Sequence, residues 1–244
     1  MFKYFVKKFN SGMQDAVQAA LQISVSRPAA RAGAFDGLVR PDRKADILLA
    51  AEKLFAQRGY HAVTIRQIAE EAGVPLALVG YYYGQKHELF EAIFDHWYTT
   101  IDQRLSRLAQ AVTSGGPDLL LHIVDAFVTP VLLMRASPEG EYYALLVARE
   151  LGYASPETDR ILRKHFDPLA HAFIDALQGA MPQTTRAEAA WAYQFALGSL
   201  LHHLSDSRVE RLSNGANTAN DVAARPALVQ FIVGGMHALL HRPD

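Results

Sequence analysis

The sequence contains no cysteine among its 244 residues. Disulfide bonds, thiolate zinc sites and cysteine nucleophiles are therefore excluded, and a reducing cytoplasm is the expected compartment. No continuous apolar run approaches the roughly 20 residues that cross a bilayer, so we expect no integral membrane segment. The alternation of apolar and polar residues that is typical of strands is also scarce. Helices are therefore the expected secondary structure.

Sequence signatures of catalysis are missing as well. The chain has no Walker or dinucleotide-binding glycine loop, no serine nucleophile elbow and no HExxH zinc motif. His171 and Asp175 are four residues apart and His202 adjoins His203, but neither pair matches a known metal signature. We therefore expect neither an enzyme nor a metal or cofactor site.

The charged residues are distributed unevenly along the chain. Residues 1 to 90 have a net charge of +4, whereas residues 91 to 244 have a net charge of −5. A basic first part is typical of a region that contacts a polyanion. This asymmetry predicts that the first part of the chain meets nucleic acid.

Residues 1–40 are interpreted as a flexible N-terminal extension. The first ten residues, MFKYFVKKFN, place Phe2, Phe5 and Phe9 at helical spacing among lysines. Such a basic amphipathic pattern also suits a membrane surface or a partner, which keeps open the alternative of a helical scaffold or membrane-associated adaptor. Translation from Met13 is a second alternative, and the segment lacks the apolar core of a secretory signal.

Three short helices are expected between residues 41 and 83. Apolar residues at helical spacing place the first over 42–58, and Gly59 ends it. Thr64 is a candidate N-cap for the second, which ends at Gly73, and the third runs from Val74 to Tyr82. Two helices joined by a glycine turn behind a third are typical of a helix-turn-helix. The last of the three is then the one that enters the major groove.

The tyrosines at the end of that third helix fit the same interpretation. Tyr81 and Tyr82 can donate phenolic hydrogen bonds to phosphate oxygens, and Lys86 adds a positive charge nearby. Val74, Val79 and Tyr83 are expected to face inward.

The rest of the chain is also expected to be helical, which makes the fold all-α. The predicted helices cover 85–112, 117–134 with a kink at Pro130, 139–151, 155–177, 185–204 and 225–241, and residues 214–220 form a polar loop.

Residues 43 to 94 resemble the DNA-binding domain of the tetracycline-repressor (TetR) family of bacterial regulators. The likeness rests on RKADILLAAEKLFAQRGYHAVTIRQIAEEAGV, on GYYY and on QKHELF. The resemblance implies DNA contacts from the second helix, from the recognition helix and from the start of the next helix: Thr64, Arg66, Leu76, Ala77, Gly80, Tyr81, Tyr82 and Lys86. For Thr64 and Arg66 we also keep the simpler alternatives of a helix cap and an ion pair with Glu70.

The recognition helix departs from the common family pattern. Many members carry polar residues early in this helix, but here it reads Pro75-Leu76-Ala77-Leu78-Val79-Gly80. No side chain before Tyr81 can form hydrogen bonds with a base. Contacts with thymine methyl groups, Arg66 and DNA shape are therefore expected to carry the specificity.

The resemblance implies an all-helical ligand-binding and dimerisation domain in the remainder of the chain. The two most apolar helices are expected to pair with their copies in a homodimer, and a monomer core is the alternative. The predicted interface residues are Trp191, Phe195, Gly198, Leu201, Phe231, Gly235 and Met236.

Residues 142 to 205 are also similar to the fatty-acid-responsive branch of the family. A pocket between the middle helices is expected, with His122, Phe127, Met134, Arg149, His171 and Trp191 as candidate ligand contacts. For the apolar residues among these, plain core packing is the alternative. Arg149 next to Glu150 is interpreted first as part of an ion pair and second as an anchor for an acidic or thioester ligand.

These observations predict a ligand-responsive transcriptional regulator. We expect a helix-turn-helix domain over 41–90 and an effector-binding and dimerisation domain over 91–244. The expected partners are a palindromic double-stranded DNA operator, a small hydrophobic effector of acyl or aromatic type and a second copy of the chain, without a membrane. Release of a repressor by the effector is the expected mechanism.

Overall fold

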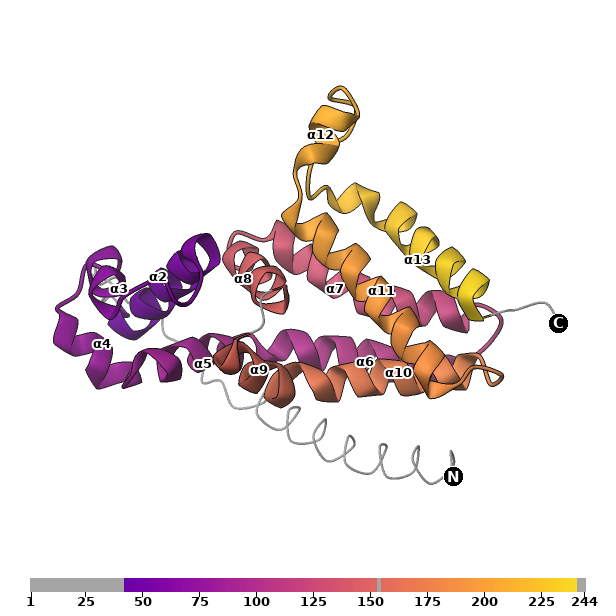
Figure 1. The fold of residues 1–244 in the computed structure, drawn as a ribbon, viewed down its shortest axis with the longest axis horizontal. Helices are drawn as coiled ribbons and strands as arrows, with labels where there is room; N and C mark the ends of the chain where they lie inside the picture. The colour runs from indigo at the N-terminus through magenta and orange to yellow at the C-terminus, as the bar shows by residue number, and fades with distance from the viewer. Residues whose placement is uncertain (1–41, 153–154, 241–244) are drawn as a thin grey trace, which may run out of the picture. The chain divides into compact units, whose positions relative to one another are not determined.

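The computed structural model describes residues 42–152 and 155–240, and every regular element in these ranges is helical (Figure 1). This confirms the all-α prediction. The predicted extension over 1–40 lies outside the described residues. The helices are α2 (Arg43–Arg58), α3 (Ile65–Glu71), α4 (Leu76–Tyr83), α5 (Lys86–His96), α6 (Tyr98–Ser114), α7 (Leu119–Ala136), α8 (Glu141–Leu151), α9 (Pro156–Ile161), the π-helical turn η1 (Leu162–Phe166), α10 (Asp167–Ala180), α11 (Arg186–Ser205), α12 (Arg208–Leu212), the 3-10 turn η2 (Val222–Ala224) and α13 (Arg225–Leu240).

Local capping residues set the starts of several helices. Asp42 accepts hydrogen bonds from the backbone N–H groups of Lys44 and Ala45 at the start of α2. Thr64 forms a capping box with Gln67 at the start of α3, and Thr185 forms one with Glu188 at the start of α11. These caps satisfy N–H groups that have no acceptor within the helix. The helix starts therefore lie close to the predicted positions.

The single long helix predicted over 85–112 is wrong, because the structure breaks it into α5 and α6 at Trp97. The Trp97 indole N–H donates to Oε2 of Glu52 on α2 at 2.7 Å, and its ring stacks on Tyr143 of α8. The Thr100 hydroxyl donates to the Trp97 carbonyl at 2.7 Å, a bond that competes with regular helical pairing. Contacts with distant residues therefore fix Trp97 at the junction of the two helices.

The continuous helix predicted over 155–177 is also interrupted. A π-helical turn, η1, separates α9 from α10. Pro168 lies two residues after the end of this turn and has no N–H with which to bond the carbonyl of Lys164, so the regular ladder fails at this point. The short helix α12 was not predicted either. The Asp206 carboxylate accepts from the Arg208 backbone N–H at 2.7 Å and helps to start it.

Two helices, α7 and α13, are long and apolar enough to cross a membrane by length and composition alone. The expectation that no segment approaches this length was therefore wrong. Half of the α7 segment is buried inside the protein, as in the core helix of a folded domain, whereas only 17% of the segment ending in α13 is buried. The outer face of α13 is thus apolar and uncovered in the single chain.

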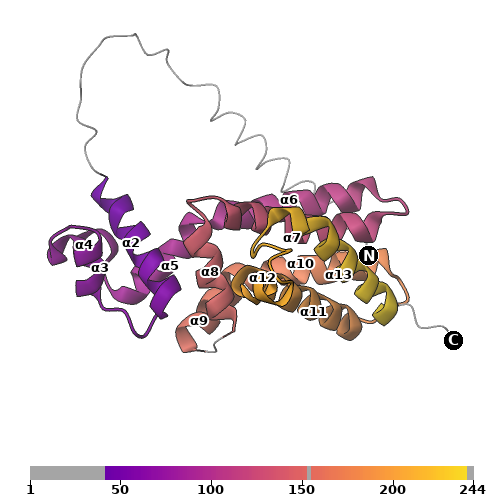
Figure 2. The same cartoon turned by 90° about the horizontal axis from the view of Figure 1, so that it is seen from above.

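Buried apolar side chains form two clusters. The first contains side chains of α2, α3, α4 and α5 and extends to Tyr143 and Leu146 of α8 and Ile161 of α9. The second lies between α6, α7, α10, α11 and α13. Figure 2 shows α8 beside α2, and these two helices pack against each other. The helices that carry the helix-turn-helix therefore share a core with a helix of the second half.

Candidate nucleic-acid interface and effector domain

Helix α4 packs inward through the fully buried Val79 and the half-buried Leu78 and Tyr83, and it exposes the opposite side of its surface. Val79 is completely buried and Val74, just before the helix, is 8% exposed, so both face inward as predicted. On the opposite side lie five exposed residues that the sequence assigns to DNA contact: Leu76, Ala77, Gly80, Tyr81 and Tyr82. Tyr81 is the most open of them, at 79% exposure. The structure therefore brings these five residues together on one accessible face.

The turn before α4 sets its direction. Gly73 has φ of 63°, in the left-handed region that glycine adopts without steric cost. The backbone N–H of Val74 donates to the Ala69 carbonyl at 3.0 Å, which closes the turn against α3. Pro75 caps α4 without a side-chain hydrogen bond. The first N–H groups of α4 therefore have no side-chain acceptor and can meet an anion.

The third tyrosine of the run has a structural role. The Tyr83 hydroxyl donates to the Lys44 carbonyl at 2.8 Å and so ties the end of α4 to the start of α2. Burial raises the pKa of Tyr83 to about 12. Lys44 itself is exposed and lies next to the Tyr83 ring. Sequence reasoning did not single out Lys44, although a basic pair, Arg43-Lys44, at the start of α2 was a visible signal.

Lys86 is at the first position of α5, but its side chain is half-buried. Its ammonium lies 4.3 Å from the centre of the Tyr60 ring and 6.0 Å from that of Phe55. Burial lowers the pKa of Lys86. A phosphate contact from Lys86 therefore competes with these rings, and this role stays a prediction.

Thr64 and Arg66 are both exposed, and they differ in their partners within the chain. The Thr64 side chain accepts from the Gln67 backbone N–H at 3.3 Å, and its hydroxyl donates to the Gln67 side chain at 3.0 Å. The capping alternative therefore describes Thr64 in the free chain. Among the described residues, Arg66 forms no ion pair with Glu70, so its guanidinium is open to a ligand.

The six candidate ligand contacts do not converge. His122, Arg149, His171 and Trp191 are exposed, Phe127 is buried, and only Met134 lines a cavity that lies between α6, α7, α8 and α11. Phe127 contacts Phe173 edge-on within the second core cluster. Their role as ligand contacts stays a prediction. Arg104 and Tyr143 instead line this cavity. Neither residue was predicted from the sequence, although Arg104 lies on the apolar face of α6 with Ile101 and Leu108.

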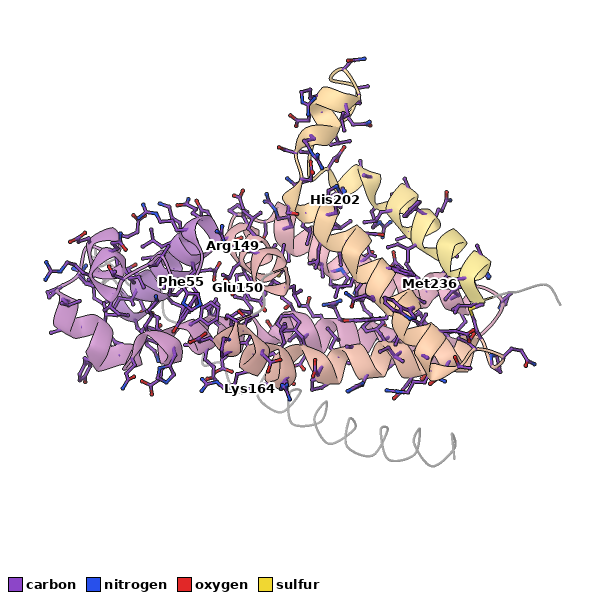
Figure 3. The ribbon with its side chains drawn as sticks, viewed as in Figure 1. Phe55, Arg149, Glu150, Lys164, His202 and Met236 are labelled. Carbon is purple, nitrogen blue, oxygen red and sulfur yellow. The ribbon has the colours of Figure 1, made fainter. Side chains whose placement is uncertain are left out.

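The predicted ion pair at Arg149 is absent from the described residues. Arg149 is exposed at the end of α8, donates to the Gln57 carbonyl at 3.3 Å and contacts the α2 side at Gly59. Glu150 is buried and accepts from the Thr158 hydroxyl at 2.5 Å. The two neighbours, labelled in Figure 3, point to different elements because successive residues of a helix lie on different faces.

The predicted dimer residues divide between an outer face and the core. On the outer face, Trp191 stacks on Phe195 with ring centres 5.5 Å apart. Their side chains are 59% and 57% exposed, and Phe231 is 70% exposed. Gly198 and Gly235 are exposed, Leu201 is half-buried and Met236 is buried. A groove of about 710 Å³ runs along this face between α11 and α13.

Comparisons with known proteins agree with this arrangement. Residues 47–93 match the model of bacterial regulatory proteins of the tetR family, and residues 125–235 match that of the tetracyclin repressor-like C-terminal domain. The transcriptional activator FasR of Mycolicibacterium smegmatis is 31% identical over 117 residues, which are 47% of this chain and 52% of FasR. The match therefore spans about half of FasR.

Two solved structures share the fold. HlyIIR, a hemolysin II transcriptional regulator, superposes with a TM-score of 0.57 at 18% identity, covering 82% of this chain and 98% of HlyIIR. FadR from Bacillus subtilis, in complex with stearoyl-CoA, superposes with a TM-score of 0.50 at 16% identity, covering 78% and 98%.

The matched models and curated relatives are transcriptional regulators, which confirms the expectation that the chain is not an enzyme. The helix-turn-helix segment and the helical second half both match domain models of one family. The chain belongs to the tetracycline-repressor (TetR) family.

Proposed function

We propose that the protein is a homodimeric repressor that leaves a palindromic operator when a small hydrophobic effector binds. The observation that carries this proposal is the exposed face of α4. It displays Leu76, Ala77 and two tyrosines, while Val79 beneath them is fully buried. A helix held rigidly by its inner face and open on its outer face suits insertion into the major groove.

Base recognition by this face relies on shape and apolar contact. Leu76 and Ala77 carry no hydrogen-bonding group, and a Cβ atom added at Gly80 meets no atom within 4 Å. The backbone of α4 can therefore approach the floor of the groove closely. Apolar side chains discriminate thymine by its methyl group, and Arg66 supplies the polar contact from α3. The two tyrosine hydroxyls suit phosphate oxygens on either side.

Dimer formation is supported by the outer face of α11 and α13. Trp191, Phe195 and Phe231 are large apolar side chains, each more than half exposed on this face. Their contiguous exposure is unfavourable in water, so a second copy that covers it stabilises the protein. Two-fold pairing of this face presents two α4 helices to successive turns of a palindrome.

Effector binding in the helical half is supported by a protein of similar fold that was solved with a ligand. FadR from Bacillus subtilis was solved with stearoyl-CoA. A cavity lies between α6, α7, α8 and α11 in this chain. The junction at Trp97 can couple that cavity to DNA, because Tyr143 lines the cavity, stacks on Trp97, and Trp97 donates to Glu52 of α2. Movement of Tyr143 therefore acts directly on the core that holds α4.

The test is recovery of sheared genomic DNA from the source organism with the purified protein, followed by sequencing. The wild type is expected to enrich a few sites with an inverted repeat, and Tyr81→Ala is expected to lose them. Tyr98→Ala is the matched control, because Tyr98 is an exposed tyrosine of α6 outside the predicted interface. Uniform background from the wild type at low salt would contradict sequence-specific binding and favour the scaffold alternative.

Repression is tested separately with a reporter under the recovered site. Deletion of the gene is expected to raise reporter expression. A fall in expression would assign the protein to activators instead. The cytoplasmic location is part of the same proposal, since the operator is genomic DNA.

A further inference from the structure

Arg104 of α6 is a buried charge inside the second core cluster. Its side chain is 7% exposed, and it lies on the same face of α6 as Ile101 and Leu108, which are 3% and 5% exposed. Arginine stays protonated in proteins, so burial cannot be relieved by loss of the proton. A buried charge is costly unless it is paired and hydrogen-bonded. An anionic partner that accepts hydrogen bonds from the guanidinium would therefore stabilise the protein.

No protein partner for this charge is present among the described residues. No carboxylate lies within 4.0 Å of Arg104 in the described part of the chain, and its Nε and Nη2 atoms have no hydrogen-bond acceptor. The guanidinium carbon lies 4.6 Å from the centre of the Phe127 ring and 5.8 Å from that of Phe173. These rings attract the cation through their faces but offer no acceptor for its N–H groups.

The two unpartnered nitrogen atoms are adjacent on one edge of the guanidinium. Nε and Nη2 point their N–H groups in parallel, the arrangement that binds both oxygens of one carboxylate. The rings of Phe127 and Phe173 lie against the group and hold its plane. The free edge is therefore oriented in advance for a bidentate anion.

A cavity of about 50 Å³ adjoins Arg104 and supplies the remaining features of a binding site. Tyr143 also lines it, is 2% exposed, and has a hydroxyl without a hydrogen-bond partner. The other walls are largely apolar, with Ile101, Val131 and Leu200 among them. Two residues that line one small, largely apolar cavity thus carry three unpartnered polar atoms: Nε and Nη2 of Arg104 and the Tyr143 hydroxyl oxygen.

We propose that Arg104 anchors a carboxylate of the effector, with Tyr143 as a second donor, so that the effector is an organic monoanion with an apolar tail. This inference rests on the proposed function only in taking the cavity as the effector site. The carboxylate receives two parallel N–H bonds from Arg104 and an O–H bond from Tyr143. Its negative charge neutralises the buried guanidinium.

The size of the cavity decides where the tail lies. A volume of about 50 Å³ has room for the acid group and a few carbon atoms at most. Met134, Leu197 and Leu201 also line the cavity and are only half-buried. The tail is therefore expected to displace these flexible side chains toward the surface of α7 and α11, which requires the protein to open on binding.

Packing alone does not account for an arginine at this position. A methionine or leucine would fill the same space without a charge and without orphaned donors. Residues kept for binding commonly reduce the stability of the free protein. We therefore expect Arg104→Met to raise the melting temperature of the ligand-free protein by at least about 2 °C.

The binding test uses isothermal titration calorimetry on the full chain without DNA. The probes are octanoate and octanamide, which share a tail and differ in charge. Wild type is expected to bind octanoate at least about 100-fold more tightly than octanamide, and Arg104→Met is expected to lose octanoate binding. Tyr143→Phe keeps the ring on Trp97 and removes only the hydroxyl, so a loss of about 5- to 10-fold is expected.

Several results would overturn the inference. These are equal binding of the two probes, octanoate binding that survives Arg104→Met, or absence of octanoate binding to the wild type. A lower melting temperature for Arg104→Met with no effect of Tyr143→Phe on octanoate binding would assign Arg104 to packing. Operator release is measured separately. Octanoate that binds through Arg104 without releasing operator DNA would contradict the proposed repressor mechanism and leave the carboxylate site in place.

Discussion

Two exposed surfaces of the protein carry aromatic side chains, and the chemistry of the rings differs between them. On α4 the exposed rings are Tyr81 and Tyr82, whereas on α11 and α13 they are Trp191, Phe195 and Phe231. Phenol hydroxyls can bond to hydrated phosphate oxygens, while phenylalanine rings offer only apolar area. The α4 surface therefore suits a polyanion, whereas the α11 and α13 surface suits another apolar surface, namely the same surface of a second copy.

The largest expected effect comes from a charge placed on the second surface. Phe231→Asp is expected to weaken dimerisation by at least about 100-fold, because a buried interface cannot hydrate the new carboxylate. Operator binding falls with it, since one protomer contacts only half of a palindrome. Analytical ultracentrifugation and operator titration measure both effects. Leu133→Asp is the matched control, because Leu133 is an exposed leucine of α7 and does not line the groove between α11 and α13. A monomeric wild type would contradict the assignment of the α11 and α13 surface to pairing with a second copy.

The next effect concerns Glu52, where the two halves of the protein meet. Glu52 is 3% exposed, and burial raises its pKa to about 7, while the hydrogen bond from Trp97 opposes the shift. The folded protein therefore binds this proton more tightly than the unfolded chain does. The contribution of Glu52 to the free energy of unfolding accordingly falls as pH rises from about 4.5 to about 7, and it stays low above that range.

Glu52→Gln removes this dependence, because glutamine resembles the protonated acid and still accepts from the indole. The variant is expected to be more stable than wild type by about 2 to 3 kcal/mol at pH 8 and by much less at pH 5. Urea unfolding at the two pH values measures the difference. Glu70→Gln, at an exposed position of α3, is the matched control. A gap between Glu52→Gln and wild type that does not change with pH would contradict the assignment.

Local signals in the sequence were sufficient for much of this fold. Thr64 and Thr185 each had an acceptor residue three positions later, and Gly73 has the positive φ that a tight turn requires. These features act within four residues, so they can be read without a structure. The exposed face of α4 was also predicted, because the helical spacing that turns Val74 and Val79 inward leaves the predicted contact residues on the opposite side.

Contacts between distant residues could not be predicted from the sequence. The break at Trp97 depends on Glu52, 45 positions earlier, and on the ring of Tyr143. Arg104 was visible as an arginine on an apolar helix face, but its lack of a partner is a property of the packed core. His122, His171 and Arg149 were predicted as ligand contacts, yet the rotation of their helices places them at the surface.

A smaller effect tests the difference between the rings themselves. Tyr81→Phe keeps the exposed ring and removes the hydroxyl, so operator affinity is expected to fall about 5- to 10-fold without a change in stability. Phe195→Tyr makes the opposite change on the second surface and is expected to leave DNA binding of the assembled dimer unchanged. Fluorescence anisotropy with a labelled operator measures both. Full affinity in Tyr81→Phe would show that the hydroxyl of Tyr81 makes no phosphate contact.

The smallest expected effect is that of Lys86→Ala. Its ammonium already lies over the Tyr60 ring and burial lowers its pKa, so only part of its charge interaction is left for phosphate. We expect affinity to fall about 3-fold for operator and for random DNA alike, with a salt dependence lower by about one phosphate contact. Lys53→Ala is the control, because Lys53 is held by Glu71 at 2.5 Å. A change in sequence preference would instead place Lys86 against a base. Lys44, the exposed lysine next to Tyr83, would then be the candidate for the phosphate contact.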